Sequence, residues 1–190
     1  MAAASAGTIA DPYASLPGVA ARRPEATRGF IFQQTMLRIR DPGPSLAFYT
    51  ETLGMTLALK LDFPDMAFSL YFLAFVDDPA AQIPSDPKQR AAWVFRQPAV
   101  LELTHNHGTE AAGSDFAGYK SGNEPEARGF GHIGLSVPDV AAACERFEKM
   151  GVAFVKRPDE GAMKGLAFVK DPDGYWVEIL NADTTAQYAR

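Results

Sequence analysis

Apolar and polar residues follow two similar patterns, one in each half of the chain. "QTMLRIRDPGPSLAFYTETLGMTL" begins at Gln34, and "HIGLSVPDVAAACERFEKMGVAFV" begins at His132. Each reads as a short apolar strand, a turn with Asp and Pro, an amphipathic helix, a glycine and a second strand. Gly54 and Gly151 hold the same relative place and are typical of left-handed helix ends. The pattern predicts an internal repeat.

Each predicted helix carries one apolar face with the spacing of the helical period. The residues of the two faces are Leu46, Tyr49 and Leu53 in the first helix, and Val140, Cys144, Phe147 and Met150 in the second. Two further strands follow in each half, "FSLYFLAF" and "AVLELTHN" in the first, "GLAFVKD" and "YWVEIL" in the second. The sequence therefore predicts an α+β fold made of two βαβββ modules.

The repeat also predicts how the chain is divided. The expected segments are an N-terminal arm (1–29), a first module (30–110), a linker (111–127), a second module (128–183) and a tail (184–190). An insertion near 76–97 is rich in Pro and Asp, and we expect it to be a surface excursion. The arm is rich in Ala and Pro, which favours a segment that is flexible or packs on a partner. Its arginines also suit a transit peptide, against which Asp11 and Glu25 argue.

Composition excludes several classes of protein. The net charge of −5 over 190 residues argues against a nucleic-acid-binding surface. Because no apolar run approaches the length of a membrane span, we expect no membrane partner. The single cysteine, Cys144, fits a reducing compartment, and we expect a cytoplasmic protein.

Two glutamates stand where carboxylates are costly to bury. Glu102 lies in "AVLELTHN" and Glu178 in "YWVEIL", at equivalent places in the last strand of each half. Gln34 and His132 are equivalent in the first strands. All four side chains offer a lone pair, and two carboxylates would neutralise a divalent cation. This mixed oxygen and nitrogen set leaves room for substrate, unlike the thiolate set of structural zinc.

Each of these residues also has an ordinary structural explanation. Gln34 and Glu102 could be outward residues of strands, His132 a satisfied core histidine, and Glu178 the partner of a lysine. The matched positions in two halves favour a joint role. His105 and His107 form a rival metal-binding pair, but they face away from Glu102 if the strand persists. We expect those two histidines to be exposed linker residues.

Strand alternation adds candidate ligand-binding residues to the predicted site. Gln34 shares a face with Arg38, and Glu102 shares one with Asn106. Arg128 lies four residues before His132. Two guanidinium groups and an amide beside a metal would suit an anionic, peptide-like ligand. Surface ion pairing is the alternative for either arginine.

The motifs "QQTMLRIRDP", "SLAFYTETLGM", "LELTHN", "RGFGHIGLSVPDV" and "MKGLAFVKDPDGYWVEIL" resemble the glyoxalase I family of the vicinal oxygen chelate superfamily. The resemblance covers about residues 30 to 182. It implies a metal-dependent lactoylglutathione lyase activity, in which the hemithioacetal of methylglyoxal and glutathione becomes S-D-lactoylglutathione by proton transfer through a metal-bound ene-diolate.

The resemblance also implies the roles of individual residues. The implied metal ligands are Gln34, Glu102, His132 and Glu178. Glu178 is the implied catalytic base, with Glu102 as its symmetric counterpart. The implied glutathione-contacting residues are Arg38, Asn106, Arg128, Lys156 and Met163. We expect the hydrophobic pocket for the methyl group to be lined by Leu61, Phe63, Met66, Leu70 and Phe72. Two departures from the family pattern are Ala162, in place of a lysine, and His107, in place of a tryptophan.

The metal and the assembly follow from the same resemblance. The long arm and the insertion are similar to the zinc-preferring type, so we expect one Zn²⁺ per site, with Ni²⁺ or Co²⁺ as alternatives. We expect a homodimer with active sites at the subunit interface, in which Gln34 and Glu102 of one subunit face His132 and Glu178 of the other.

Three other functions of this fold are weighed against the four ligands. A 2-methyl-acyl-CoA epimerase favours a histidine where Glu102 stands. An antibiotic-sequestering protein needs no metal, so retention of all four ligands argues against it. A ring-cleaving dioxygenase requires two histidines and one acid around iron, for which Gln34 is unsuited.

Overall fold

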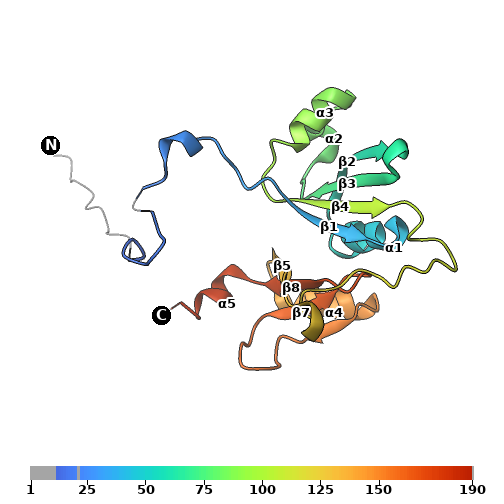
Figure 1. Cartoon of the computed structure of the whole chain (residues 1–190). Coiled ribbons are helices and arrows are strands. Elements are labelled where there is room, and N and C mark those ends of the chain that lie inside the picture. The colour runs from blue at the N-terminus through green and yellow to red at the C-terminus, as the bar shows by residue number, and fades with distance from the viewer. Residues whose placement is uncertain (1–11, 21, 190) are drawn as a thin grey trace. The chain divides into compact units, whose positions relative to one another are not determined.

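The computed structural model describes residues 12–20 and 22–189, and the chain divides into two compact units, residues 1–32 and 33–190 (Figure 1). Residues 1–11 and 21 of the expected arm, and residue 190 of the expected tail, lie outside the described residues. The described part of the first unit holds one 3-10 turn, η1 (Glu25–Thr27). Arg23 fixes this turn, because its Nε donates to Thr27 Oγ1 over 3.1 Å.

The second unit contains both predicted modules, and the α+β class is confirmed. The first sheet consists of β1 (Gln34–Ile39), β2 (Thr56–Phe63), β3 (Phe68–Ala74) and β4 (Val100–Asn106), in the order β1-β4-β3-β2. Strand β1 pairs parallel to β4, and the other pairs are antiparallel. The helical connection after β1 is α1 (Pro42–Ala47) and the π-helical turn η2 (Phe48–Thr52), and η3 (Pro64–Met66) joins β2 to β3.

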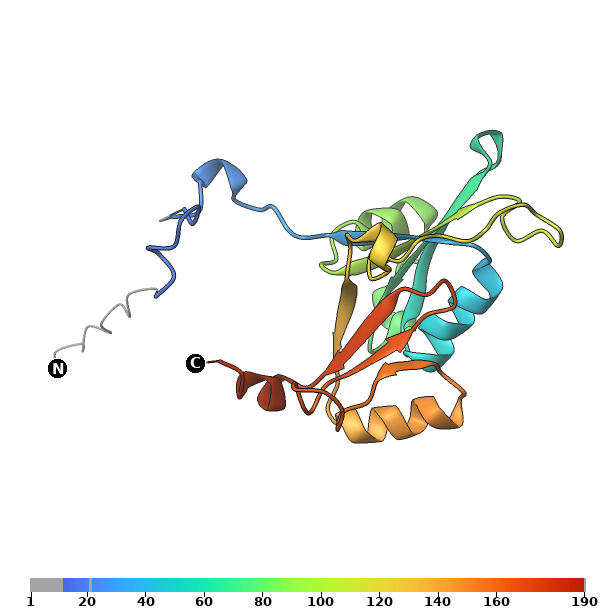
Figure 2. The same ribbon diagram turned by 60° about the horizontal axis from the view of Figure 1, so that its bottom comes forward.

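The second sheet repeats this topology. Its strands are β5 (His132–Ser136), β6 (Phe154–Lys156), β7 (Ala167–Lys170) and β8 (Trp176–Leu180), in the order β5-β8-β7-β6. The turn η4 (Pro125–Ala127) precedes β5, and helix α4 (Val140–Lys149) follows β5. Helix α5 (Ala182–Ala186) follows β8 (Figure 2). In both sheets the first and last strands are neighbours, so each module brings its two candidate ligands together. No helix in the described ranges is long and apolar enough to cross a membrane.

The helix ends are fixed by the residues that the sequence indicates. Asp41 accepts a hydrogen bond from Gly43 N over 2.8 Å, and Asp139 accepts one from Ala142 N over 3.0 Å. Gly54 and Gly151 have φ of 82° and 74°, the left-handed conformation that ends a helix.

One hydrophobic core joins the two modules. It contains Leu37 and Leu103 from the first sheet and Val177 and Ile179 from the second, each at most 4% exposed. Met150, predicted for the apolar face of the second helix, is instead 44% exposed because it caps the C-terminal end of α4. The two modules therefore bury one face of each sheet in a common interior.

The insertion near 76–97 is largely exposed, and it is also attached to the first sheet. It forms α2 (Pro79–Gln82) and α3 (Pro87–Val94), and it contributes buried side chains to a second core cluster. Val94 is 1% exposed and packs in this cluster with Phe72 and Val100 of the first sheet. The insertion is thus anchored by a few apolar side chains, because burying Ile83 and Val94 on the sheet removes apolar surface from water.

Candidate active site

The first sheet positions half of the predicted ligand set. Met36 of β1 lies opposite Glu102 of β4, so Gln34 and Glu102 occupy the same face of neighbouring strands. The amide Nε2 of Gln34 donates a hydrogen bond to Glu102 Oε2. Thr104 Oγ1 donates to the other carboxylate oxygen over 3.1 Å. Glu102 is only 8% exposed, and among the described residues no cationic side chain forms an ion pair with it.

The amide oxygen of Gln34 is a second atom of this half-set that suits a cation. Gln34 Oε1 is buried, and no described residue donates a hydrogen bond to it. A buried acceptor without a partner is costly, and a bound cation would supply one. Gln34 Oε1 and the nearby Glu102 carboxylate are therefore the chemical type of donor that a divalent metal ion requires.

The second sheet positions the other half of the set. His132 Nε2 lies 3.3 Å from Glu178 Oε2, and the two side chains are 42% and 17% exposed. Gly134 lies opposite Glu178 on β5, and Phe168 lies opposite it on β7. The ring of Phe168 packs edge-on against the imidazole of His132, with centroids 5.1 Å apart. This pair is more open to solvent than the pair in the first sheet.

The two half-sets do not meet within one chain. In residues 12–20 and 22–189, no three His, Cys, Asp or Glu side chains gather closely enough to hold a metal ion. Glu102, His132 and Glu178 would form such a group if the predicted site lay within one chain. Each module therefore offers one complete pair of donors and no more.

Arg38 and Arg128, the two arginines of the predicted ligand-binding set, are exposed side chains. Arg38 is exposed on the face of β1 that carries Gln34, opposite Thr104 of β4. Arg128 is exposed and follows η4 directly, four residues before His132. No ion pair in the described part of the chain involves either arginine, so ordinary surface pairing does not account for them. Both guanidinium groups are available to an anionic ligand.

Lys156 and Met163 are placed less favourably for a ligand. Lys156 Nζ donates to the backbone oxygens of Leu166 and Arg157 over 2.6 and 3.1 Å. Loss of hydration on burial lowers the pKa of this ammonium group. Met163 is 48% exposed in the loop between β6 and β7. Their contact with glutathione stays a prediction.

Most of the predicted pocket residues share the face of Glu102. Phe72 lies opposite Glu102, Leu61 opposite Leu70, and Phe63 opposite Phe68. Phe72 belongs to the second core cluster together with Val94 of the insertion, and Leu61 and Leu70 pack against this cluster. Met66 differs, because it is 66% exposed in the turn η3.

Phe95 is a pocket candidate that the sequence reasoning missed. Its ring packs edge-on against that of Phe72 with centroids 5.2 Å apart, although it follows α3 in the insertion. The apolar run "AAWVF" was the available signal. It was overlooked because the insertion was expected to lie away from the sheet.

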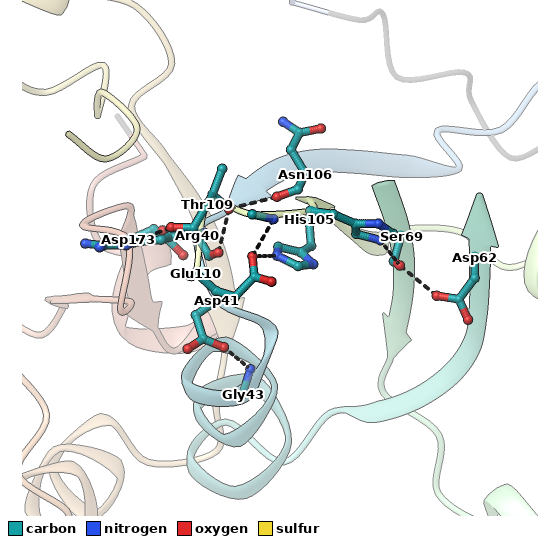
Figure 3. A network of polar contacts seen from close by, with 12 residues as sticks. Arg40, Asp41, Gly43, Asp62, Ser69, His105, Asn106, Thr109, Glu110 and Asp173 are labelled. Carbon is teal, nitrogen blue, oxygen red and sulfur yellow. Dashed lines mark hydrogen bonds and ion pairs between the residues drawn. The ribbon is translucent and has the colours of Figure 1, made fainter. Parts of the chain in front are cut away.

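The rival histidines were partly misjudged. His107 is exposed as expected, but His105 is only 5% exposed. Strand β4 continues through Asn106, so the side chain of His105 lies on the buried face of the sheet. His105 Nε2 lies 2.7 Å from Glu110 Oε2 (Figure 3). His107 Nε2 lies 2.8 Å from Ser69 Oγ. Each histidine thus has its own polar partner.

The comparisons with known proteins point to one family. The family model of the Glyoxalase/Bleomycin resistance protein/Dioxygenase superfamily matches residues 31–179. A lactoylglutathione lyase of Pseudomonas putida is 55% identical over 166 residues, which cover 87% of this chain and 93% of that protein. A lactoylglutathione lyase of Pseudomonas aeruginosa is 48% identical over 174 residues, or 92% and 95% of the two chains.

Solved structures give the same result. The trypanothione-dependent glyoxalase I of Leishmania major is 32% identical with a TM-score of 0.56, and the match covers 83% of this chain and 91% of that one. Glyoxalase I of Zea mays is 26% identical with a TM-score of 0.54, and the match covers 80% of this chain but 44% of the maize chain. With its two βαβββ modules and its near-complete match to lactoylglutathione lyases, the chain belongs to the glyoxalase I family of the Glyoxalase/Bleomycin resistance protein/Dioxygenase superfamily.

Proposed function

We propose that the chain is a lactoylglutathione lyase that converts the hemithioacetal of methylglyoxal and glutathione into S-D-lactoylglutathione. The observation that carries this proposal is the pair of matched half-sites, Gln34 with Glu102 and His132 with Glu178, on equivalent strands of the two sheets. The direct test is conversion of the preformed hemithioacetal to a thioester, followed by its absorbance, before and after chelation of metal. A protein that forms no thioester with any divalent metal would contradict the proposal.

The four donors fit a divalent metal ion. Within the described part of the chain, Gln34 Oε1 has no hydrogen-bond partner and Glu102 has no Lys or Arg counter-charge, and His132 and Glu178 complete an oxygen and nitrogen set. When bound, such an ion supplies Lewis-acid stabilisation of the negative charge that develops on the substrate oxygens. We favour Zn²⁺, with Ni²⁺ or Co²⁺ as alternatives. Reconstituting the metal-free protein with each ion and measuring turnover tests this choice, and inactivity with Zn²⁺ would contradict it.

Glu178 is the better candidate for the base that moves the proton. Both oxygens of Glu102 already accept hydrogen bonds, from Gln34 and Thr104, so neither is turned freely towards a substrate. Among the described residues, the ion pair of Glu178 is with His132, and Glu178 is more exposed than Glu102. The base takes the proton from one carbon and returns it to the adjacent carbon, so no redox cofactor is consumed.

A C2 homodimer accounts for the separated half-sites. Two modules must face each other to assemble four donors, and the two modules of one chain do not bring theirs together. The face of the second sheet with His132 and Trp176 is partly open to solvent, as an interface in the isolated chain would be. The length of the yeast Glyoxalase I also favours this assembly: the match spans 46% of that protein, as expected if two such chains were joined.

Complementation tests the shared site directly. Inactive Glu102→Ala and Glu178→Ala chains are mixed under conditions that allow subunits to exchange. If sites combine residues of both chains, a mixed dimer has one site with both lesions and one intact site, so activity recovers towards half. No recovery despite proven exchange would place each site within one chain.

Glutathione is the favoured thiol because Arg38 and Arg128 are exposed, form no ion pair with any described residue, and belong to the same strand or segment as Gln34 and His132; such groups hold carboxylates. The Leishmania relative, described as trypanothione-dependent, makes another peptide thiol the second candidate. Comparing hemithioacetals of glutathione, trypanothione and a simple thiol discriminates these substrates. We also propose a cytoplasmic location, where reduced glutathione is available and the buried thiol of Cys144 persists.

A further inference from the structure

The linker between the modules contacts the proposed glutathione site. Asn106 Nδ2 donates a hydrogen bond to the phenolic oxygen of Tyr119 over 3.0 Å. The ring of Tyr119 is half-buried and packs edge-on against Phe116 with centroids 4.7 Å apart. Tyr119 is therefore held by its own segment while its hydroxyl reaches the last residue of β4.

The backbone of Asn106 is fixed independently of its side chain. Thr109 donates from both Oγ1 and N to Asn106 O, over 2.9 and 3.3 Å. Figure 3 shows the side chain of Asn106 pointing away from His105 and Glu110. Since the amide nitrogen faces Tyr119, the amide oxygen is the end left to accept from a ligand. No described residue donates to that oxygen.

Tyr119 and Arg38 both act on one neighbouring side chain, that of Tyr175. Burial, then the charges of Asp171 and Asp173, raise the pKa of Tyr175 to about 12, and Tyr119 and Arg38 are the next groups that act on it. Arg38 and Asn106 share one face of the first sheet. The hydroxyl of Tyr119 thus stands beside the surface where the peptide part of the substrate is proposed to bind.

The same linker holds the segment that carries Arg128. Gly129 N donates to Gly122 O over 3.0 Å, and Asn123 Nδ2 donates to Gly131 O. Gly122 approaches this segment so closely that a Cβ atom there would lie 2.1 Å from Phe130 O. The linker is therefore a fixed element that touches both halves of the proposed ligand-binding set.

We propose that Tyr119 is a positioning residue that orients the amide of Asn106 for the peptide part of the thiol substrate. The inference rests on the proposed function and adds a residue of the linker to it. Because Tyr119 touches no reacting atom, it acts on substrate binding and leaves the chemical step unchanged. Loss of its hydroxyl frees the amide to rotate and to present nitrogen where the substrate requires an acceptor.

The test is Tyr119→Phe, which keeps the ring and its packing on Phe116 and removes only the hydroxyl. We expect KM for the glutathione hemithioacetal to rise about three- to ten-fold with kcat within about two-fold of wild type. S-methylglutathione, an unreactive conjugate, should bind more weakly by the same factor in calorimetry. Tyr71→Phe is the matched control, because Tyr71 is 7% exposed and lies on the opposite face of the first sheet.

A double-mutant comparison decides whether Tyr119 acts through Asn106. Tyr119→Phe should add nothing to KM in an Asn106→Ala background. An unchanged KM in the single variant, an equal added effect in the Asn106→Ala background, or a loss confined to kcat would each overturn the positioning role. If the wild type forms no thioester, the proposed function fails and this inference fails with it. If the wild type is active and Tyr119→Phe matches it, only the positioning role fails.

Discussion

Asp171→Asn tests how the stability of the contact between the two modules depends on pH. The Asp171 carboxylate is 5% exposed in the turn before β8. It accepts hydrogen bonds from Tyr49 Oη of the first module and from the backbone N–H groups of Tyr175 and Asp173, over 2.8, 2.8 and 3.0 Å. An asparagine can retain all three contacts, since its oxygen accepts from the backbone and its nitrogen donates to Tyr49. The substitution therefore removes a charge with little change in shape.

The expected magnitude follows from the pKa of this group. Burial raises the pKa of Asp171 from 3.8 to about 6, and the hydrogen bond from Tyr49 and those from the backbone oppose the rise only in part. Between these values the folded state holds more protons than the unfolded state, so raising the pH favours unfolding. The stability that the neutral form provides is complete below about pH 3.8 and is lost as the pH rises through 6. A difference of about two pKa units corresponds to about 3 kcal/mol.

The assay is urea unfolding of metal-free protein from about pH 4 to pH 8, at one fixed protomer concentration, because metal and dimerisation also stabilise the fold. We expect the free energy of unfolding of Asp171→Asn, relative to wild type, to increase by about 3 kcal/mol across this range. Asp77→Asn, which removes an exposed carboxylate, is the control, and its free energy of unfolding relative to wild type should hardly change with pH. If the free energy of unfolding of Asp171→Asn relative to wild type stays constant or falls as the pH rises, the reasoning is refuted.

Three further predictions concern the site. Glu178→Gln should retain metal, measured by equilibrium dialysis, yet lose about 10²- to 10⁴-fold in kcat, because an amide ligates but accepts no proton; near wild-type turnover would remove Glu178 from the base role. Arg38→Ala and Arg128→Ala should raise KM for the hemithioacetal more than they lower kcat, since they hold a non-reacting part of the substrate, and a loss confined to kcat would contradict this. Gly122→Ala should lower the free energy of unfolding, followed by thermal unfolding, by about 1–3 kcal/mol, because the added Cβ atom would clash with backbone atoms. Gly131→Ala is the control and should be nearly neutral, because a Cβ atom there meets open space. Equal melting temperatures for the two variants would contradict this.

The sequence alone determined the repeated architecture and the residues that hold its elements. Periodicity distinguishes helix from strand, while Asp41, Asp139, Gly54 and Gly151 mark helix ends through local backbone chemistry. These signals depend on residues a few positions apart, so they survive without knowledge of the rest of the chain. The matched positions of the four candidate ligands follow from the same repeat.

Only the tertiary structure decided which distant groups meet. It showed that the insertion packs on the first sheet, that His105 is buried beside Glu110, and that Tyr119 contacts Asn106. It also showed that the two modules share a core through their other faces, which keeps the two donor pairs apart in one chain. Burial of apolar surface is non-directional and depends on every packed neighbour, so a local pattern does not specify these contacts.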